Sequence, residues 1–217
     1  MRQLAVHWLG RVGYENALAT QERLAEARHG GTAGDTLLLL EHAPVVTLGR
    51  GFKREHLLFT EDALRARGVE VFAASRGGDV TYHGPGQLVG YPVLDLKPDR
   101  CDVRRYVRDL EEAMIRALAD LGVVAERMPG AIGVFVGRDK IGAIGVHISR
   151  WITTHGFALN VSTDLSYTDL IVPCGLKQCG ATSVEKILGR APTVASVGQI
   201  VARHLAEILG ARIKPPT

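Results

Sequence analysis

The stretch from residue 76 to residue 92, RGGDVTYHGPGQLVGYP, constrains this chain more than any other. It holds five glycines and two prolines, and it joins a predicted strand at 69–74 to one at 88–94. Glycine allows backbone conformations and close approaches that a β-carbon would block. Polar groups that a structural turn does not need come from Arg76, Asp79, Thr81, Tyr82, His83 and Gln87. The stretch is therefore typical of a segment that holds a ligand.

Length and composition predict one domain spanning residues 1–217, because 217 residues with 46% hydrophobic content suffice for one buried core. The net charge of +3 is spread along the chain without a Lys/Arg block, so no nucleic-acid partner is expected. No window approaches the roughly 18 apolar residues of a membrane span, and the first 17 residues do not resemble a secretory signal. We therefore expect a cytoplasmic protein without a membrane partner.

Periodicity predicts an α/β fold with a mixed sheet flanked by helices. The predicted strands cover residues 3–9, 36–40, 45–48, 69–74, 88–94, 132–136, 140–148 and 151–161. The predicted helices cover 14–28, a short segment from Thr60 to Gly68, a long one from the Asp102 cap to Gly122, and one from Thr193 to Gly210. Residues 48–53 are interpreted as a basic turn, and residues 214–217 as a loose tail.

Cys174 is the candidate nucleophile among three cysteines. Pro173 stiffens the approach to it, Gly175 leaves room for a substrate, and residues 181–184 resemble the start of a helix. Cys179 is interpreted as structural and Cys101 as a bystander. An odd number of cysteines argues for reduced thiols, and the spacing of 174 and 179 does not predict a metal site.

A nucleophilic cysteine needs a partner that removes or stabilises its proton. Lys140 is the candidate, since small residues follow it on a predicted strand; an exposed lysine at a hairpin end is the alternative. His83 is a rival base, because imidazole titrates near neutrality, and a structural histidine is the alternative there. A cluster of positive charge, formed by Arg100, Arg104, Arg105 and Arg108, is either a docking site for an acidic carrier protein or a solvated helix face.

These residues together resemble the lipoyl(octanoyl) transferase family over nearly the whole chain. The family signature R-G-G-x-x-T-aromatic-H-x-x-G-Q-x-x-x-Y is similar to residues 76–91, and the family's lysine and Pro-Cys-Gly positions correspond to Lys140 and 173–175. The resemblance implies the fold of the biotin/lipoate protein ligase catalytic domain. It also implies a substrate-binding set formed by Arg76, Gly77, Gly78, Asp79, Val80, Thr81, Tyr82, His83, Ala143, Ile144, Gly145, Gly156, Phe157 and Ala158.

The activity implied by the resemblance is an acyltransferase that moves an octanoyl or lipoyl group through a thioester on Cys174. The donor would be octanoyl-acyl carrier protein. The acceptors would be lysines of lipoyl domains, in 2-oxoacid dehydrogenases and in the glycine cleavage H protein. A thioester is already activated, so neither a cofactor nor a metal is expected.

Three alternatives share many of these features. An ATP-dependent lipoate or biotin ligase would not need the thiol, a non-catalytic module would bind the acyl carrier without turnover, and a cysteine hydrolase would pass the acyl group to water. The glycines at 77, 78 and 145 are expected to form a narrow wall of an acyl slot. Gly145→Leu is accordingly expected to block long acyl chains while leaving the fold intact.

Overall fold

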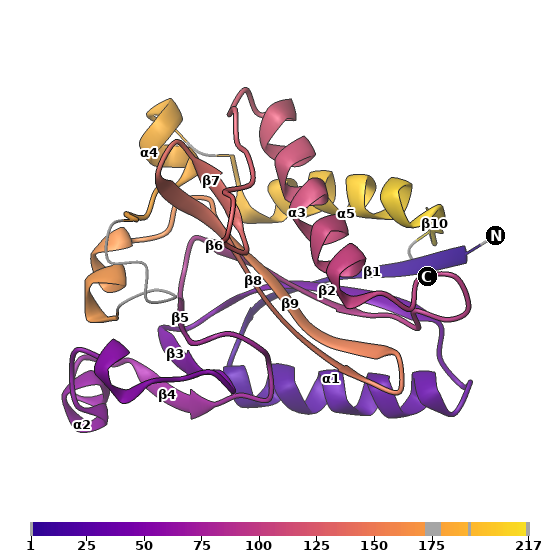
Figure 1. The fold of residues 1–217 in the computed structure, drawn as a ribbon, viewed down its shortest axis with the longest axis horizontal. Coiled ribbons are helices and arrows are strands. Elements are labelled where there is room, and N and C mark those ends of the chain that lie inside the picture. Colours follow the sequence, from indigo (N-terminus) through magenta and orange to yellow (C-terminus); the bar gives the residue numbers. More distant parts are fainter. Residues whose placement is uncertain (1, 172–178, 191, 216–217) are drawn as a thin grey trace.

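The computed structural model describes residues 2–171, 179–190 and 192–215, so Cys174 lies outside the described residues. A seven-stranded sheet dominates the fold, in the order β10-β1-β2-β6-β9-β8-β7 (Figure 1). Its strands are β1 (Arg2–Val12), β2 (Asp35–His42), β6 (Gln87–Val93), β7 (Val134–Val136), β8 (Asp139–Ser149), β9 (Ile152–Asn160) and β10 (Ala211–Ile213). β1 pairs in parallel with β2 and β10, and the other pairs are antiparallel. The predicted mixed sheet is confirmed.

A three-stranded sheet lies beside it, in the order β4-β3-β5, with strands β4 (Glu70–Ala73), β3 (Val45–Leu48) and β5 (Val80–His83). The prediction missed β5, because no predicted strand covers residues 80–83. Tyr82 and His83 are buried, and β5 pairs with β3, opposite Val46 and Val45. Cross-strand pairing and burial have overridden the local turn signals there.

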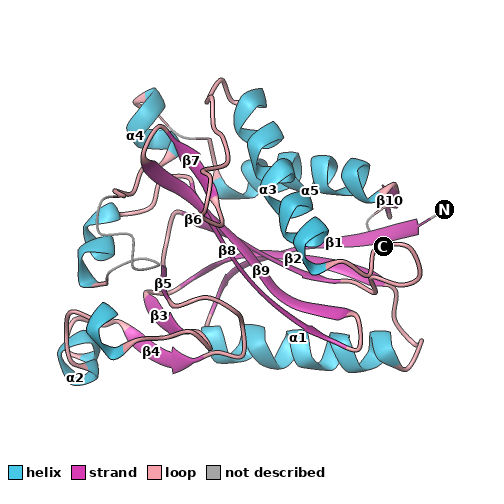
Figure 2. Cartoon of the chain, viewed as in Figure 1, coloured by secondary structure: helices cyan, strands magenta, loops and turns pink. Residues whose placement is uncertain are grey.

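The helices cover both faces of the large sheet (Figure 1), and Figure 2 distinguishes helices, strands and loops by colour. The long helices are α1 (Tyr14–His29) on one face, with α3 (Val103–Asp120) and α5 (Val194–Leu209) on the other. The short ones are η1 (Arg54–His56), α2 (Glu61–Arg65), η2 (Leu165–Leu170) and α4 (Val184–Leu188). The predicted caps are confirmed, since the side chains of Thr60, Asp102 and Thr193 each accept a backbone N–H.

Several predicted boundaries differ from the structure. β7 begins at Val134, and Ile132, expected in that strand, is 58% exposed. Lys214, expected in a loose tail, donates its backbone N–H to the carbonyl of Leu4, and β10 just before it was not predicted. Three residues are too short a segment to carry a periodic signal.

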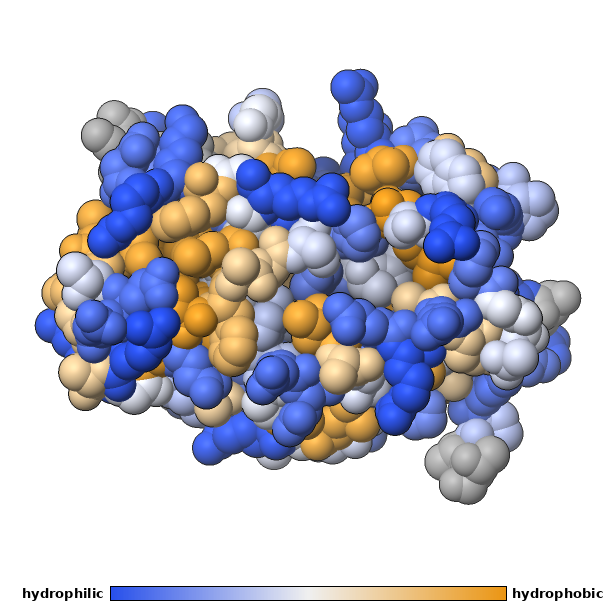
Figure 3. Space-filling view, turned by 90° about the horizontal axis from the view of Figure 1, so that it is seen from below, coloured by the Kyte–Doolittle hydropathy of each residue, from blue (hydrophilic) through white to orange (hydrophobic). Residues whose placement is uncertain are grey.

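The face shown in Figure 3 mixes hydrophilic and hydrophobic side chains, with a broad hydrophobic area on its left half, the side of α2 and β4. Within the described ranges, no helix combines the length and the apolar character that crossing a membrane requires.

Candidate active site

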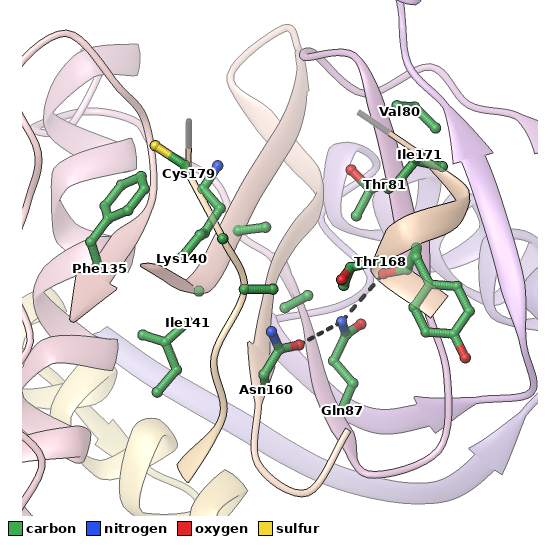
Figure 4. A pocket seen from close by; sticks show the side chains of 16 residues that line it. Val80, Thr81, Gln87, Phe135, Lys140, Ile141, Asn160, Thr168, Ile171 and Cys179 are labelled. Atoms are coloured by element: carbon green, nitrogen blue, oxygen red, sulfur yellow. Dashed lines mark hydrogen bonds between the residues drawn. The ribbon is translucent and has the colours of Figure 1, made fainter. Parts of the chain in front are cut away.

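A mostly apolar cavity of about 70 Å3 lies between the two sheets, and we call it the Lys140 cavity. Its walls come from β5, β6, β8 and β9, from η2 and from residues 179–181. Figure 4 shows Lys140 and Cys179 side by side at one end, and Gln87, Asn160 and Thr168 towards the other. The cavity therefore offers an amine and a thiol at one end of a largely hydrophobic space.

Lys140 is held at the start of β8 through its backbone. Its N–H donates to the carbonyl of Gly180 at 2.9 Å, and its carbonyl accepts from the N–H of Thr182 at 3.0 Å. Lys140 also pairs with Phe135 of β7, and its Nζ lies 5.4 Å from the centroid of that ring. The segment that follows the undescribed residues 172–178 is thereby attached to the strand that carries the lysine.

A second cavity, the His83 cavity, shares the wall residues Thr81, Ala143 and Ala158 with the first. Ala143 and Ala158 are direct cross-strand partners on β8 and β9. The cavity measures about 20 Å3, which is room for roughly one water molecule. Its other lining residues include several polar ones: Tyr14, Arg76, His83, Tyr91 and His155.

Buried histidines surround the His83 cavity in their neutral form. Burial, reinforced by the nearby His42, lowers the pKa of His83 to about 3. Burial and the neighbouring Arg76 lower the pKa of His155 to about 4. His83 donates from Nδ1 to Oε1 of Gln87 at 2.7 Å, so its neutral tautomer is fixed. Across the described residues, no cluster of three or more His, Cys, Asp or Glu side chains has an arrangement that could hold a metal ion.

Arg76 anchors the glycine-rich loop. Its guanidinium donates to the carbonyl and hydroxyl of Thr47 and to the carbonyl of Gly77. A β-carbon at Gly145 would lie 2.9 Å from Cδ of Arg76 and 3.0 Å from the Gly77 carbonyl oxygen. Gly145→Leu would therefore displace Arg76 and its loop, so the expectation of an undisturbed fold is corrected.

The glycines at 49 and 51 have a supporting role that the basic-turn interpretation missed. The N–H groups of Gly49 and Gly51 donate to the carbonyls of Asp79 and Gly78, and that of Arg50 donates to the carbonyl of Arg76. Asp79 is also paired with His56. The turn after β3 therefore fixes the shape of the loop from residue 76 to residue 79.

A groove on the other side of Lys140 runs between that loop, the edge of β8 and the start of α3, and we call it the α3 groove. Gly77, Gly78, Asp79, Ile144 and Gly145 line it near Lys140. Val103, Val107 and Ile132 line it further out. Lys140 is common to the α3 groove and the Lys140 cavity.

Each described residue of the expected site lines the Lys140 cavity, the His83 cavity or the α3 groove. The Lys140 cavity is lined by Val80 and Tyr82, the His83 cavity by Arg76, His83 and residues 156–157, and the α3 groove by residues 77–79. Two of these spaces share each of the remaining residues, which are 81, 140, 143–145 and 158. Cys174 lies outside the described residues. Cys179, interpreted as structural, lines the Lys140 cavity, and its only sequence signal was the small pair Gly180-Ala181 after it.

The model of one protein family, the lipoyl protein ligase A/B catalytic domain, matches residues 13–206. The chain belongs to this family. It is 54% identical over 215 residues to the octanoyltransferase of Solibacter usitatus, a match that covers 99% of this chain and 97% of that one. It is 50% identical over 214 residues to the octanoyltransferase of Myxococcus xanthus, covering 96% of this chain and 60% of the longer relative. Within the ligase A/B family, this chain is therefore an acyltransferase that resembles the octanoyltransferases.

Solved structures of lipoate and biotin protein ligases share the fold of this chain over nearly its whole length. Lipoate-protein ligase A bound with ATP matches with a TM-score of 0.75 at 19% identity, over 100% of this chain and 88% of that one. Biotin protein ligase from Aquifex aeolicus, in complex with biotin and ATP, matches with a TM-score of 0.60 at 18% identity, over 95% of this chain and 70% of that one. The fold implied by the sequence resemblance is confirmed.

Proposed function

We propose that this chain transfers an octanoyl group from acyl carrier protein to a lysine of lipoyl domains, through a thioester on Cys174. The observation that carries the proposal is the Lys140 cavity, an apolar space with an amine at one end. The octanoyltransferase relatives support the choice of acyl group. The proposed acceptors are the lipoyl domains of 2-oxoacid dehydrogenases and the glycine cleavage H protein.

The position of Cys174 in the chain supports its role. Ile171 and Cys179, which precede and follow the undescribed residues, both line the Lys140 cavity. Cys174 is only three residues from Ile171 and five from Cys179 in the sequence. This closeness in sequence to two residues of the cavity wall supports Cys174 as the nucleophile.

The proposed reaction has two steps. The Cys174 thiolate, paired with the Lys140 ammonium, attacks the carbonyl carbon of the donor thioester, the carbon–sulfur bond to the carrier breaks, and the carrier sulfur leaves as a thiol with the proton of that ammonium. The ε-amine of the acceptor lysine then attacks the new thioester, and the Cys174 sulfur leaves as an amide forms. Lys140 stabilises the thiolate in the first step and accepts the proton of the incoming amine in the second.

The part of β8 that lines the cavity is about as long as an eight-carbon chain. Lys140 and Ala143 are three residues apart on β8, or about 10 Å along the strand. An extended octanoyl chain spans about 9 Å from carbonyl to methyl, for bonds of about 1.5 Å in a zigzag. Burial of about six methylenes at ~0.8 kcal/mol each contributes roughly 5 kcal/mol to holding the tail.

Intact-protein mass spectrometry after incubation with octanoyl-carrier protein tests the proposal. We expect an octanoyl adduct that hydroxylamine removes, present on the wild type and on Cys179→Ser but absent from Cys174→Ser. Adducts that depend on Cys179 instead would reassign the nucleophile. Acyl transfer without an adduct on any variant would exclude the covalent route.

An ATP-dependent ligase is the second candidate, favoured by the shared fold with lipoate-protein ligase A bound with ATP. Such an enzyme activates free octanoate and does not need Cys174. Incubation with octanoate, ATP and a lipoyl domain separates the two candidates, since acylation by the Cys174→Ser variant would support the ligase.

A further inference from the structure

The α3 groove leads away from Lys140 to the protein surface. Beyond Val103, Val107 and Ile132, it continues between α3 and residues 127–132 to Arg104 and Arg108. Its inner and outer parts have volumes of about 560 and 540 Å3. Val103 is 46% exposed and Ile132 is 58% exposed, so two branched apolar side chains face solvent in it. The groove is therefore an exposed, partly apolar path that ends at the candidate active site.

The outer end of the groove carries positive charge that the helix itself does not favour. Arg104, Arg105 and Arg108 are exposed in the first turns of α3, where the helix dipole is positive. The first turn holds no acidic residue, and like charges four residues apart destabilise a helix. Since these arginines weaken their own helix, a role in binding something negative accounts for them better than a structural role.

Neighbouring arginines are neutralised within the protein. Arg127 pairs with Glu111 and Glu112, and Arg100 pairs with Asp109. In the described part of the chain, neither Arg104 nor Arg108 forms an ion pair. The rim of the α3 groove thus keeps two uncompensated guanidinium groups next to exposed apolar side chains.

We infer that the α3 groove is the docking site of the acyl donor, a small acidic carrier protein that presents its acyl group on a long flexible arm. The inference rests on the proposed function. The arm lies in the groove with its thioester at Lys140, and the acidic face of the carrier contacts Arg104 and Arg108. The acyl tail then enters the Lys140 cavity, which shares Lys140 with the groove.

The size of the groove favours the arm of a donor over the side chain of an acceptor lysine. Five heavy atoms of a lysine occupy on the order of 150 Å3 at about 30 Å3 for each. Either half of the groove is more than three times larger. A lysine side chain would leave most of the apolar wall exposed, whereas an extended arm would cover it.

The test compares two donors, octanoyl-carrier protein and octanoyl-pantetheine, which has the arm without the protein. The variant Arg104→Glu/Arg108→Glu reverses the rim charge, and acidic residues at a helix start preserve the helix. Its matched control is Arg23→Glu, an exposed arginine of α1 on the opposite face of the large sheet. A third variant, Ala131→Trp, fills the groove itself.

We expect the double variant to raise KM for octanoyl-carrier protein about tenfold or more, with kcat unchanged and a weaker dependence on salt. Its turnover of octanoyl-pantetheine should equal that of the wild type and of Arg23→Glu. Ala131→Trp should slow both donors. An unchanged KM for the carrier, or a raised KM for the lipoyl-domain acceptor instead, would overturn the docking inference. A wild-type enzyme that does not accept octanoyl-carrier protein at all would instead refute the proposed function.

Discussion

Gly133 and Lys140 are in contact at a point where the glycine has no room for a side chain. A β-carbon at Gly133 would lie 2.8 Å from Cε of Lys140 and 2.5 Å from the carbonyl oxygen of Gly142. The φ of Gly133 is +129°, a conformation that residues other than glycine rarely adopt. The N–H of Gly133 donates to the buried carboxylate of Glu111 at 3.0 Å, which fixes the glycine against α3. The lysine side chain thus lies against a backbone that a hydrogen bond joins to α3.

Gly133→Ala should therefore displace Lys140 as well as strain the backbone. We expect a loss of about 1–3 kcal/mol in unfolding free energy and a marked fall in the rate of octanoyl-enzyme formation. Gly137→Ala is the control, because Gly137 also has a positive φ, +58°, but a β-carbon there meets nothing. The control should lose stability only. Equal activity of the two variants would show that Gly133 does not position the lysine.

Ala158→Leu should shorten the acyl chain that the enzyme accepts. Ala158 is 4% exposed and lies in the wall between the Lys140 cavity and the His83 cavity, opposite Ala143. Added atoms there occupy the space proposed for the last carbons of an octanoyl chain. We expect kcat/KM for octanoyl donors to fall about tenfold or more. A tenfold fall corresponds to a loss of roughly 1.4 kcal/mol in transition-state stabilisation. Butanoyl donors, whose chains end before this wall, serve as the internal control and should be used normally.

Asn160→Asp should disturb the segment that is paired with Lys140. Nδ2 of Asn160 donates to the carbonyl of Thr182 at 3.0 Å, and its Oδ1 accepts from Gln87 at 3.0 Å. A carboxylate would place two acceptors against each other, at a cost of about 1–3 kcal/mol. Octanoyl-enzyme formation, followed by mass spectrometry, should slow. Asn16→Asp, at an exposed position of α1, should change nothing. Wild-type rates for Asn160→Asp would mean that this contact does not support the active site.

The buried histidines should make the protein sensitive to acid. His83 and His155 have lowered pKa values of about 3 and about 4 in the folded protein, against roughly 6.5 when unfolded. Between pH 6.5 and 4, only the unfolded chain binds these protons, so the free energy of unfolding falls as the pH falls. Each histidine adds up to about 1.4 kcal/mol per pH unit to that slope.

Urea unfolding at pH 7.5, 6 and 5 measures this dependence. His155→Asn should flatten it, and asparagine tolerates the positive φ of +55° at this position. A slope that His155→Asn leaves unchanged would contradict the assignment of acid sensitivity to the histidines. Because His83 stays neutral above pH 5, its titration should not change the rate of acyl transfer in that pH range.

Local signals in the sequence predicted the helices well and the sheets in part. Asp102 and Thr193 are short polar residues before long amphipathic runs, and both cap the predicted helices. The strand β5 was missed because glycines and a proline flank its four residues, and its pairing with β3 depends on contacts distant in sequence. Strand order across the seven-stranded sheet follows from packing of that kind, which periodicity does not encode.

The candidate site was predicted to a similar extent: local signals identified its residues, but not the contacts between distant parts of the chain. Glycines and polar residues close together in sequence identified the stretch from 76 to 83, and Lys140 was identified by the small residues after it. The small pair after Cys179 did not predict that this residue lies near Lys140, because that proximity depends on the pairing of Ala181 with Lys140 of β8. The uncompensated charge of Arg104 and Arg108 likewise became evident only when the partners of the neighbouring arginines were known.

The two hydrogen bonds that join Lys140 to Gly180 and Thr182 make the amide signals of this part of the chain suitable for following acylation. The bonded amide protons belong to Lys140 itself and to Thr182, eight residues after Cys174 in the chain. Acylation that shifts this segment would alter the chemical shifts of both amides together. Turnover can then be followed by backbone NMR on the unmodified enzyme, without a probe attached to the thiol or the amine.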